Sequence, residues 1–166
     1  MLFRSLNNTA TGTITGSIDN QGKTTNDGAI SGNITNAVSA EFLNTGTIGG
    51  NVENRGIFEN TVSAAIGKDV TNYNNFHNNG TVAGNVTNAA AAVVSNSGTI
   101  GGDVENRGIF ENTVTATIGK NVTNYSSLSN AGTISGNLAN NAAATVENTG
   151  TIGGNVENRG IFENTS

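Results

Sequence analysis

The sequence lacks cysteine, proline and tryptophan, and it has few charged or aromatic residues. Only 11% of its 166 residues are charged and 5% are aromatic. Without cysteine the chain can form no disulfide scaffold, thiolate zinc site or catalytic thiol. Proline has no backbone N–H and would remove a hydrogen-bond donor from a β ladder, and the chain has none. No apolar run approaches the roughly 20 residues that span a bilayer, so we expect no membrane insertion by this segment.

The charge of the chain is small and mixed. There are 7 basic and 12 acidic residues, which gives a formal net charge of −5. No basic patch is present to neutralise phosphates, so we expect no nucleic-acid partner. The first residues, 1–6, are too short and too weakly apolar for the core of a signal peptide. A secreted form is therefore expected to take its targeting segment from outside this sequence.

Three residue types dominate what is present. Asparagine (30), threonine (23) and glycine (23) occupy 76 of the 166 positions. Such a bias is typical of low complexity, but a disordered chain would combine high net charge with abundant proline. Isoleucine and valine also recur here at regular intervals. The composition therefore favours an ordered repeat over disorder.

Internal repetition dominates the chain. The segment Gly46–Asn60 returns almost letter for letter from Gly98 and again from Gly150, a period of 52 residues. Inside this period, the phrase Gly-Thr-Ile-x-Gly-x-Ile/Val-x-Asn recurs at steps of 16 or 18 residues, which gives three rungs per unit. We divide the chain into an N-terminal lead-in or cap, 1–11, and a repeat domain, 12–166, with units 12–63, 64–115 and 116–166.

Two columns of apolar residues run through the aligned rungs. The first is Ile14, Ile30, Ile48, Ile66, Val82, Ile100, Ile118, Ile134 and Ile152, and the second is Ile18, Ile34, Val52, Val70, Val86, Val104, Val122, Leu138 and Val156. A coil of 16–18 residues is too short for a helical hairpin, which needs about 33 residues. Thr, Val, Ile, Gly and Asn are also poor helix formers. The pattern predicts an all-β, single-stranded parallel β-solenoid of about nine rungs, with both columns facing inward.

Each rung is expected to contain very short strands, such as 47–48, 51–54 and 57–60. We expect the intervening corners to contain glycines with positive φ. The second half of the rung carries phenylalanines such as Phe58, which we assign to the core, and it gains or loses two residues between rungs. Bulges and larger loops are therefore expected there. Alanine runs such as Ala89–Ala92 are predicted to be tight corners rather than helices.

An asparagine closes every copy of the phrase. This column predicts a ladder of stacked amides along the solenoid axis, at a corner where asparagine tolerates the left-handed conformation, rather than a ligand-binding row. Its members are Asn20, Asn36, Asn54, Asn72, Asn88, Asn106, Asn124, Asn140 and Asn158.

The pair of a glutamate and an arginine beside the ladder recurs only once per unit. Glutamate precedes and arginine follows it in every third rung, as at Glu105 and Arg107. Three rungs separate like charges by about 14 Å, which exceeds the Debye length of about 8 Å at physiological salt. The 52-residue period therefore keeps like charges apart.

Residues for catalysis or ligand binding are sparse. His77 is the single histidine and has no recurring serine and carboxylate partners, so we interpret it as a solvated loop residue. Repetition of the aligned glutamates argues for a structural role, because an active site is normally one place. Gly101-Gly102-Asp103 lacks the rest of the calcium-binding nonapeptide. We expect a non-enzymatic protein with no catalytic residue, cofactor or metal.

The repeated phrases resemble a known group of proteins. The segments Asn44–Asn54 and Asn130–Asn140 are similar to the Asn-x-Gly-Thr-Ile-x-Gly repeats in passenger regions of bacterial autotransporters and filamentous-haemagglutinin-like surface adhesins. The similarity covers nearly the whole chain from Gly12. It implies a right-handed parallel β-helix on the surface of a Gram-negative cell or in its extracellular space. The chain lacks the family's signal peptide and membrane-anchoring barrel, which is expected of an excised segment or of a small relative that assembles by itself.

The leading functional expectation is the stalk of a surface adhesin or autotransporter passenger, facing an unspecified host or neighbouring-cell surface. The alternative is a fibre subunit that associates end to end, because nothing after Phe162 looks like a cap and open strand edges pair. In that alternative, Leu2, Phe3 and Leu6 form either a plug over the first rung or a contact with the last rung of a neighbouring copy.

Ice binding is a further alternative, because a flat row of threonines on a solenoid can order water. The relevant file is interrupted twice by alanine and has no second threonine file beside it. It consists of Thr13, Ala29, Thr47, Ala65, Thr81, Thr99, Thr117, Thr133 and Thr151.

Overall fold

Glycine or asparagine interrupts the apolar and polar alternation of this chain every few residues, so its strands are short. A computed structural model describes residues 2–165, with side chains for residues 5–165. Within that range, the structure contains strands, turns and bends and no helix. The strands fall into three files, here called the short, middle and long strands.

The short strands are β2 (Thr13–Ile14), β4 (Ala29–Ile30), β7 (Thr47–Ile48), β10 (Ala65–Ile66), β13 (Thr81–Val82), β16 (Thr99–Ile100), β19 (Thr117–Ile118), β22 (Thr133–Ile134) and β25 (Thr151–Ile152). The middle strands are the start of β3 (Ile18–Asn26), β5 (Ile34–Asn36), β8 (Val52–Asn54), β11 (Val70–Asn72), β14 (Val86–Asn88), β17 (Val104–Asn106), β20 (Val122–Asn124), β23 (Leu138–Asn140) and β26 (Val156–Asn158). The long strands are β1 (Leu2–Asn8), the end of β3, β6 (Glu41–Asn44), β9 (Ile57–Asn60), β12 (Asn75–Asn78), β15 (Val93–Asn96), β18 (Ile109–Asn112), β21 (Ser127–Asn130), β24 (Thr145–Asn148) and β27 (Ile161–Asn164).

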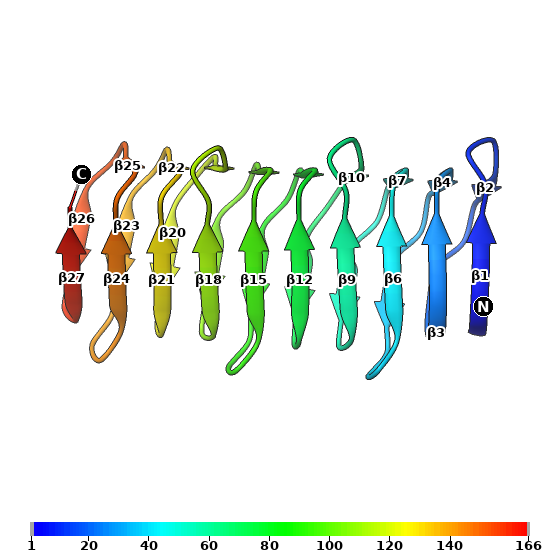
Figure 1. Ribbon diagram of the computed structural model, residues 1–166, viewed down its shortest axis with the longest axis horizontal. Coiled ribbons are helices and arrows are strands. Elements are labelled where there is room, and N and C mark those ends of the chain that lie inside the picture. Colours follow the sequence, from blue (N-terminus) through cyan, green and yellow to red (C-terminus); the bar gives the residue numbers. More distant parts are fainter. Residues whose placement is uncertain (1, 166) are drawn as a thin grey trace.

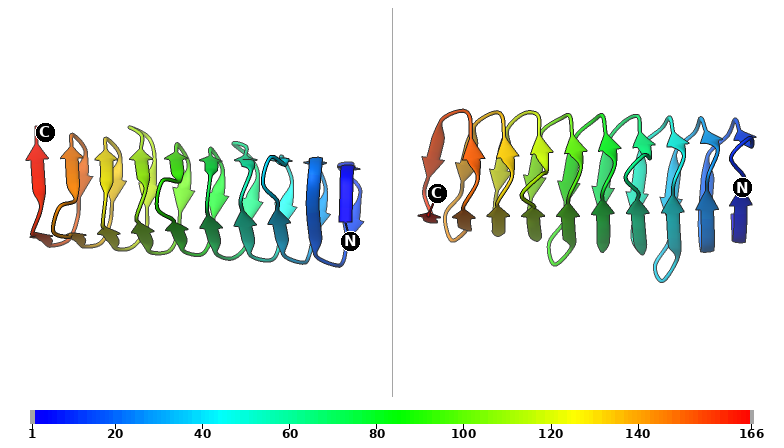
Figure 2. Two further views of the ribbon diagram at one scale, coloured as in Figure 1. Left: turned by 90° about the horizontal axis from the view of Figure 1, so that it is seen from below. Right: turned by 45° about the horizontal axis from the view of Figure 1, so that its top comes forward.

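Every strand pairs in parallel with the equivalent strand of the next coil. The short strands form a nine-stranded sheet, and the middle and long strands form a sheet of 18 strands. Figure 1 shows the coils side by side in a row, with the two termini at opposite ends, and the further views in Figure 2 show the same succession of coils. The predicted all-β parallel solenoid of about nine turns is confirmed.

The predicted inward columns form the core. Ile48 and Val52 are each 1% exposed, and the same positions are buried in the other internal coils. The phenylalanines belong to a third inward column on the long strands, as predicted. The rings of Phe42 and Phe58 stack with centroids 4.8 Å apart, and Phe76 meets Phe58 edge to face at 5.9 Å. Each of the three strands in an internal coil thus contributes one buried side chain to the core, and these side chains form three columns along the solenoid.

Close packing, and not backbone conformation, explains the corner glycines. The predicted positive φ is wrong, because no glycine in the described part of the chain has one. A Cβ atom on Gly108 would lie 2.6 Å from the carbonyl oxygen of Ala89 and even closer to that of Ala92. Left-handed backbone occurs instead at Ser39, Ala91 and Ala143, with φ of 61–63°. The ladder asparagines lie in extended strands and do not use the left-handed region either.

The residues that distinguish 16- from 18-residue coils lie in the corners on either side of the long strands. Figure 1 shows the enlarged corners as loops that project from two opposite edges of the solenoid. The predicted larger loops and the corner at Ala89–Ala92 are confirmed. The predicted bulges are wrong for the internal coils, because the only register shift among the described strand pairs lies between Phe3 and Ser5 of β1.

Candidate functional site

The predicted asparagine ladder runs the length of the solenoid at the end of the middle strands. The Nδ2 atom of each member donates to the Oδ1 atom of the next member over 2.8–3.0 Å, from Asn20 to Asn158. All members are buried except Asn158, which lies in the last coil and is exposed. The prediction is confirmed.

Each ladder amide also satisfies the backbone of its corner. In Asn106, Nδ2 donates to the carbonyl oxygens of Gly108 at 3.2 Å and Ser127 at 2.8 Å, besides Asn124 Oδ1 at 2.8 Å. Its Oδ1 accepts the Gly108 N–H at 3.1 Å and Asn88 Nδ2 at 2.9 Å. Where the chain turns, the β ladder cannot supply these partners, and an unpaired buried polar group is costly. Asparagine therefore replaces backbone hydrogen bonding at each corner.

A second ladder, which the sequence reasoning missed, ends every long strand. The same Nδ2 to Oδ1 bonds join its members over 2.7–2.8 Å. The members are Asn8, Asn26, Asn44, Asn60, Asn78, Asn96, Asn112, Asn130, Asn148 and Asn164. These residues precede the nine-residue phrase by two or four positions, so an alignment on the phrase alone scatters them. An asparagine precedes every corner in the sequence, and this regularity could have revealed the second ladder.

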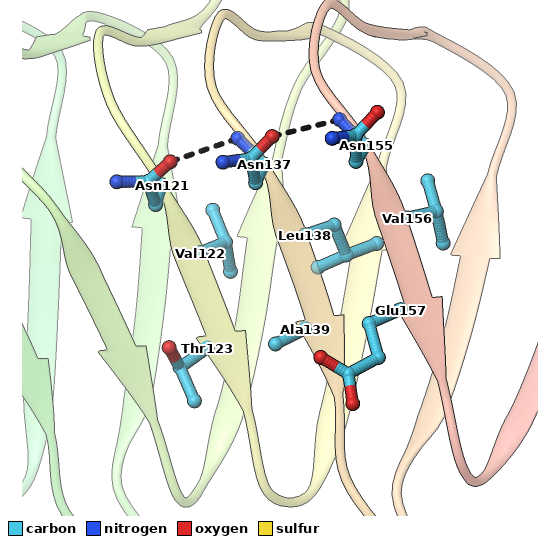
Figure 3. Close-up of a pocket in the computed structure, with 9 residues that line it drawn as sticks. All are labelled: Asn121, Val122, Thr123, Asn137, Leu138, Ala139, Asn155, Val156 and Glu157. Carbon is cyan, nitrogen blue, oxygen red and sulfur yellow. Dashed lines mark hydrogen bonds between the residues drawn. The ribbon is translucent and has the colours of Figure 1, made fainter.

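A third file of polar residues lies on the surface where the short strands turn into the middle strands. Here Oδ1 accepts the backbone N–H of the equivalent residue one coil on, over 2.7–3.1 Å. Figure 3 shows this arrangement at Asn121, Asn137 and Asn155. Because only an oxygen is needed, aspartate can replace asparagine, as it does at Asp69 and Asp103.

A shallow groove runs beside this file on the outer face of the middle strands. In Figure 3, Ala139 lies between Thr123 and Glu157 in its outward column. Alanine is the smallest residue of that column, so it leaves a notch between its two larger neighbours. The residues around the notch are the exposed third file, one acidic group and strand residues of the repeat. The notch offers hydrogen-bonding groups but brings together no set of reactive side chains.

The repeated charges form a contact between consecutive units. Arg107 pairs with Glu105 on its own coil, and its guanidinium carbon lies 4.8 Å from the ring centre of Tyr125 on the next coil. Arg55 makes the equivalent contacts, with its carbon 4.6 Å from the ring centre of Tyr73. Each tyrosine belongs to the following 52-residue unit. The charges therefore add a cation–π contact across each unit boundary.

Replacing Arg107 with alanine is expected to lower the free energy of unfolding by about 1 kcal/mol, from a half-exposed ion pair and a cation–π contact. Arg159→Ala is the matched control, because Arg159 pairs with Glu157 but contacts no tyrosine in the described part of the chain. Urea unfolding of both variants measures the difference. Equal losses would show that the ring contact contributes nothing.

The structure places the remaining candidate residues apart from one another. His77 lies on strand β12, exposed between Glu59 and Ser95 of the adjacent strands, so its predicted loop position is wrong. Among residues 2–165, no three His, Cys, Asp or Glu side chains gather where they could hold a metal ion. That same range contains no helix that is long and apolar enough to cross a bilayer.

The predicted threonine file lies on the surface, and two of the predicted assembly contacts lie at the ends of the core. The threonine file faces outward along the short strands, from Thr13 to Thr151, and its two alanines keep it interrupted; ice binding stays a prediction. Leu6 and Phe162 are partly buried against opposite ends of the core. The side chains of Leu2 and Phe3 lie outside the described residues.

Comparisons with protein-family models, with curated proteins and with solved structures find no match to this chain.

Proposed function

We propose that this chain is a non-enzymatic spacer, the stalk segment of an extracellular bacterial surface adhesin or autotransporter passenger. The observation that carries the proposal is the pair of buried asparagine ladders, which continue in register through the internal coils. The resemblance of the repeated phrases to adhesin passenger repeats supports the extracellular setting.

Stiffness along the axis is the property that a spacer needs. Every boundary between internal coils combines three parallel strand pairs, two amide bonds and three packed core columns. Because each coil contacts only its neighbours, adding repeats lengthens such a rod without altering its cross-section. One unit of three coils adds about 14 Å at the usual strand spacing. The distance between the ends of the stalk is therefore set by the number of repeats.

Pulsed electron–electron double resonance measures the distance between two spin labels and tests this spacer directly. Cysteines at Thr13 and Thr151 would be the sole cysteines of the chain and lie on one exposed file, eight coil steps apart. We expect a narrow distance distribution near 38 Å, and near 19 Å for the control pair at Thr81 and Thr151, from the strand spacing and after allowance for the label arms. A broad distribution for the long pair beside a narrow one for the short pair would contradict a rigid spacer.

A further inference from the structure

The two ends of the solenoid differ. At the C-terminal end the core is open: Val156 is 43% exposed, whereas Val104 in the equivalent place of an internal coil is 2% exposed. Ile152 and Phe162 are also only partly buried. They line a hollow at this end, together with Asn148 and Asn164 of the second ladder. We call the surface formed by Ile152, Val156 and Phe162 the C-terminal face; it exposes side chains whose equivalents are buried in the internal coils.

The hydrogen-bonding groups of the C-terminal face define what fits it. Every ladder amide donates toward the C-terminal end of the solenoid. In the last coil, Asn158 Nδ2 donates only to the carbonyl oxygen of Gly160, whereas Asn106 Nδ2 reaches three acceptors. The missing partners are an asparagine oxygen and a strand carbonyl of a following coil. The complementary surface is thus the N-terminal edge of a coil of the same repeat.

The N-terminal end is covered. Strand β1 pairs along most of β3, from Leu2 against Asp19 to Asn8 against Asn26. Beneath it, Ile18 and Asn20 are only 2% and 0% exposed. In register, Phe3 takes the place of a ladder asparagine beside Asn20.

The first ladder is terminated within this N-terminal coil. The Thr24 hydroxyl donates to Asn20 Oδ1 at 2.9 Å, where another coil would supply an amide. Thr24 itself replaces the apolar residue of the core column, since Phe42 is its partner in the next coil. The acceptor at the end of the first ladder is therefore already satisfied inside the molecule.

Strand β1 is an incomplete coil. It occupies the places of a preceding middle and long strand, but among residues 2–165 the short strand β2 pairs only with β4. A second copy stacked with β1 in place would leave one short strand missing at the junction. Asn8 and Asn164 are 156 residues apart, which is three whole units of 52. With β1 displaced, β2 of one copy would therefore follow β27 of another as β10 follows β9.

We propose that the C-terminal face of this 166-residue chain binds the N-terminal edge of a second copy, and that strand β1 is a displaceable cap that prevents this contact. Docking would place Val156 against Ile18 of the second copy, and Asn158 Nδ2 would replace the Thr24 hydroxyl as the donor to Asn20 Oδ1. Such head-to-tail contacts do not close on themselves and generate filaments. This self-association is independent of the proposed spacer role.

Loosening β1 in the full chain is the test. Leu6→Asp removes an apolar side chain of β1 that packs against the core, and Asn8→Ala removes the 2.7 Å bond from Asn8 Nδ2 to Asn26 Oδ1. We expect the unmodified chain to remain a monomer and the Leu6→Asp, Asn8→Ala chain to form linear polymers. Light scattering coupled to gel filtration measures the mass, and electron microscopy shows the filaments.

Two controls separate cap release from unspecific aggregation. Ser5 and Lys23 are partners in register on β1 and β3, and the chain has no other cysteine, so Ser5→Cys with Lys23→Cys can lock β1 by a disulfide. In the loosened background, the oxidised lock should keep the chain monomeric and its reduction should release polymers. Val156→Lys in the same background should abolish polymers by placing a charge on the C-terminal face.

The remaining outcomes contradict the proposal. A loosened chain that keeps its β-sheet circular dichroism and stays monomeric would show that β1 is not the barrier. Filaments of the unmodified chain, or equal polymerisation of the oxidised lock, would show that β1 does not cap. If the loosened chain fails to fold, a chain without residues 1–8 replaces it, and a folded monomer there would overturn the proposal. The spacer is tested separately, because the spin-label distances lie within one monomer.

Discussion

Replacing Asn106 with alanine is expected to lower the free energy of unfolding by about 3–5 kcal/mol, because several buried partners lose their hydrogen bonds at about 1–3 kcal/mol each. Asn106 is 0% exposed, and its amide makes five hydrogen bonds to two neighbouring coils and its own corner. Among the orphaned groups is Asn88 Nδ2, which donates to Asn106 Oδ1. Urea unfolding followed by circular dichroism measures the loss.

Asn137→Ala is the matched control, because Asn137 directly precedes β23 in the file of middle strands to which Asn106 belongs. Asn137 is exposed and its side chain accepts one bond, from the Asn155 N–H at 2.8 Å. We expect a loss of about 1 kcal/mol or less, because water can replace this acceptor. Asn112→Ala in the second ladder should cost less than Asn106→Ala but more than Asn137→Ala, because the buried Asn112 amide makes three hydrogen bonds. Similar losses for Asn106→Ala and Asn137→Ala would contradict the stabilising role assigned to the buried ladders.

Gly108→Ala is expected to destabilise the chain by about 3 kcal/mol, the upper part of the usual range for overpacking. The added Cβ would meet the carbonyl oxygens of Ala89 and Ala92 in the previous coil, which are backbone atoms and cannot rotate away. Moving them would disturb the neighbouring strands. Chemical denaturation of the purified variant measures this effect.

Gly16→Ala separates close packing from backbone conformation. A Cβ on Gly16 would have nothing within 4 Å, and its φ is not positive. We expect this change to be neutral or to stabilise by up to about 1 kcal/mol, because alanine restricts the unfolded chain. If both glycine variants were equally destabilised, the explanation by contact between coils would be wrong.

The fold was predictable because repetition reveals which residues share a column. One rung alone is a short polar phrase, but nine aligned rungs show that Val52 and its equivalents stay apolar while their neighbours vary. In a parallel stack each residue lies against its own equivalent, so a column in the alignment is a column in space. The first ladder was predicted for the same reason, and all its members are bonded as expected.

The second ladder shows where column reasoning fails. Asn60 lies four residues before the next phrase and Asn78 lies two residues before it, so they align only when the corner between them is allowed to change length. The structure brings them together through a 2.8 Å bond, because the inserted residues project outward as a loop. Insertions at corners leave the stacking unchanged, which sequence spacing alone does not reveal.

The sequence by itself therefore determined the coil, its three-rung period, the three core columns and one ladder, since these depend on the identity of repeated residues. Only the tertiary structure decided why the glycines are needed and how the ends differ. Gly108 is constrained by atoms of the coil before it, and the exposure of Val156 depends on having no following coil among the described residues. Both properties arise from contacts between coils. A residue pattern specifies which positions stack, whereas the distance between backbones and the cover at each end exist only after stacking.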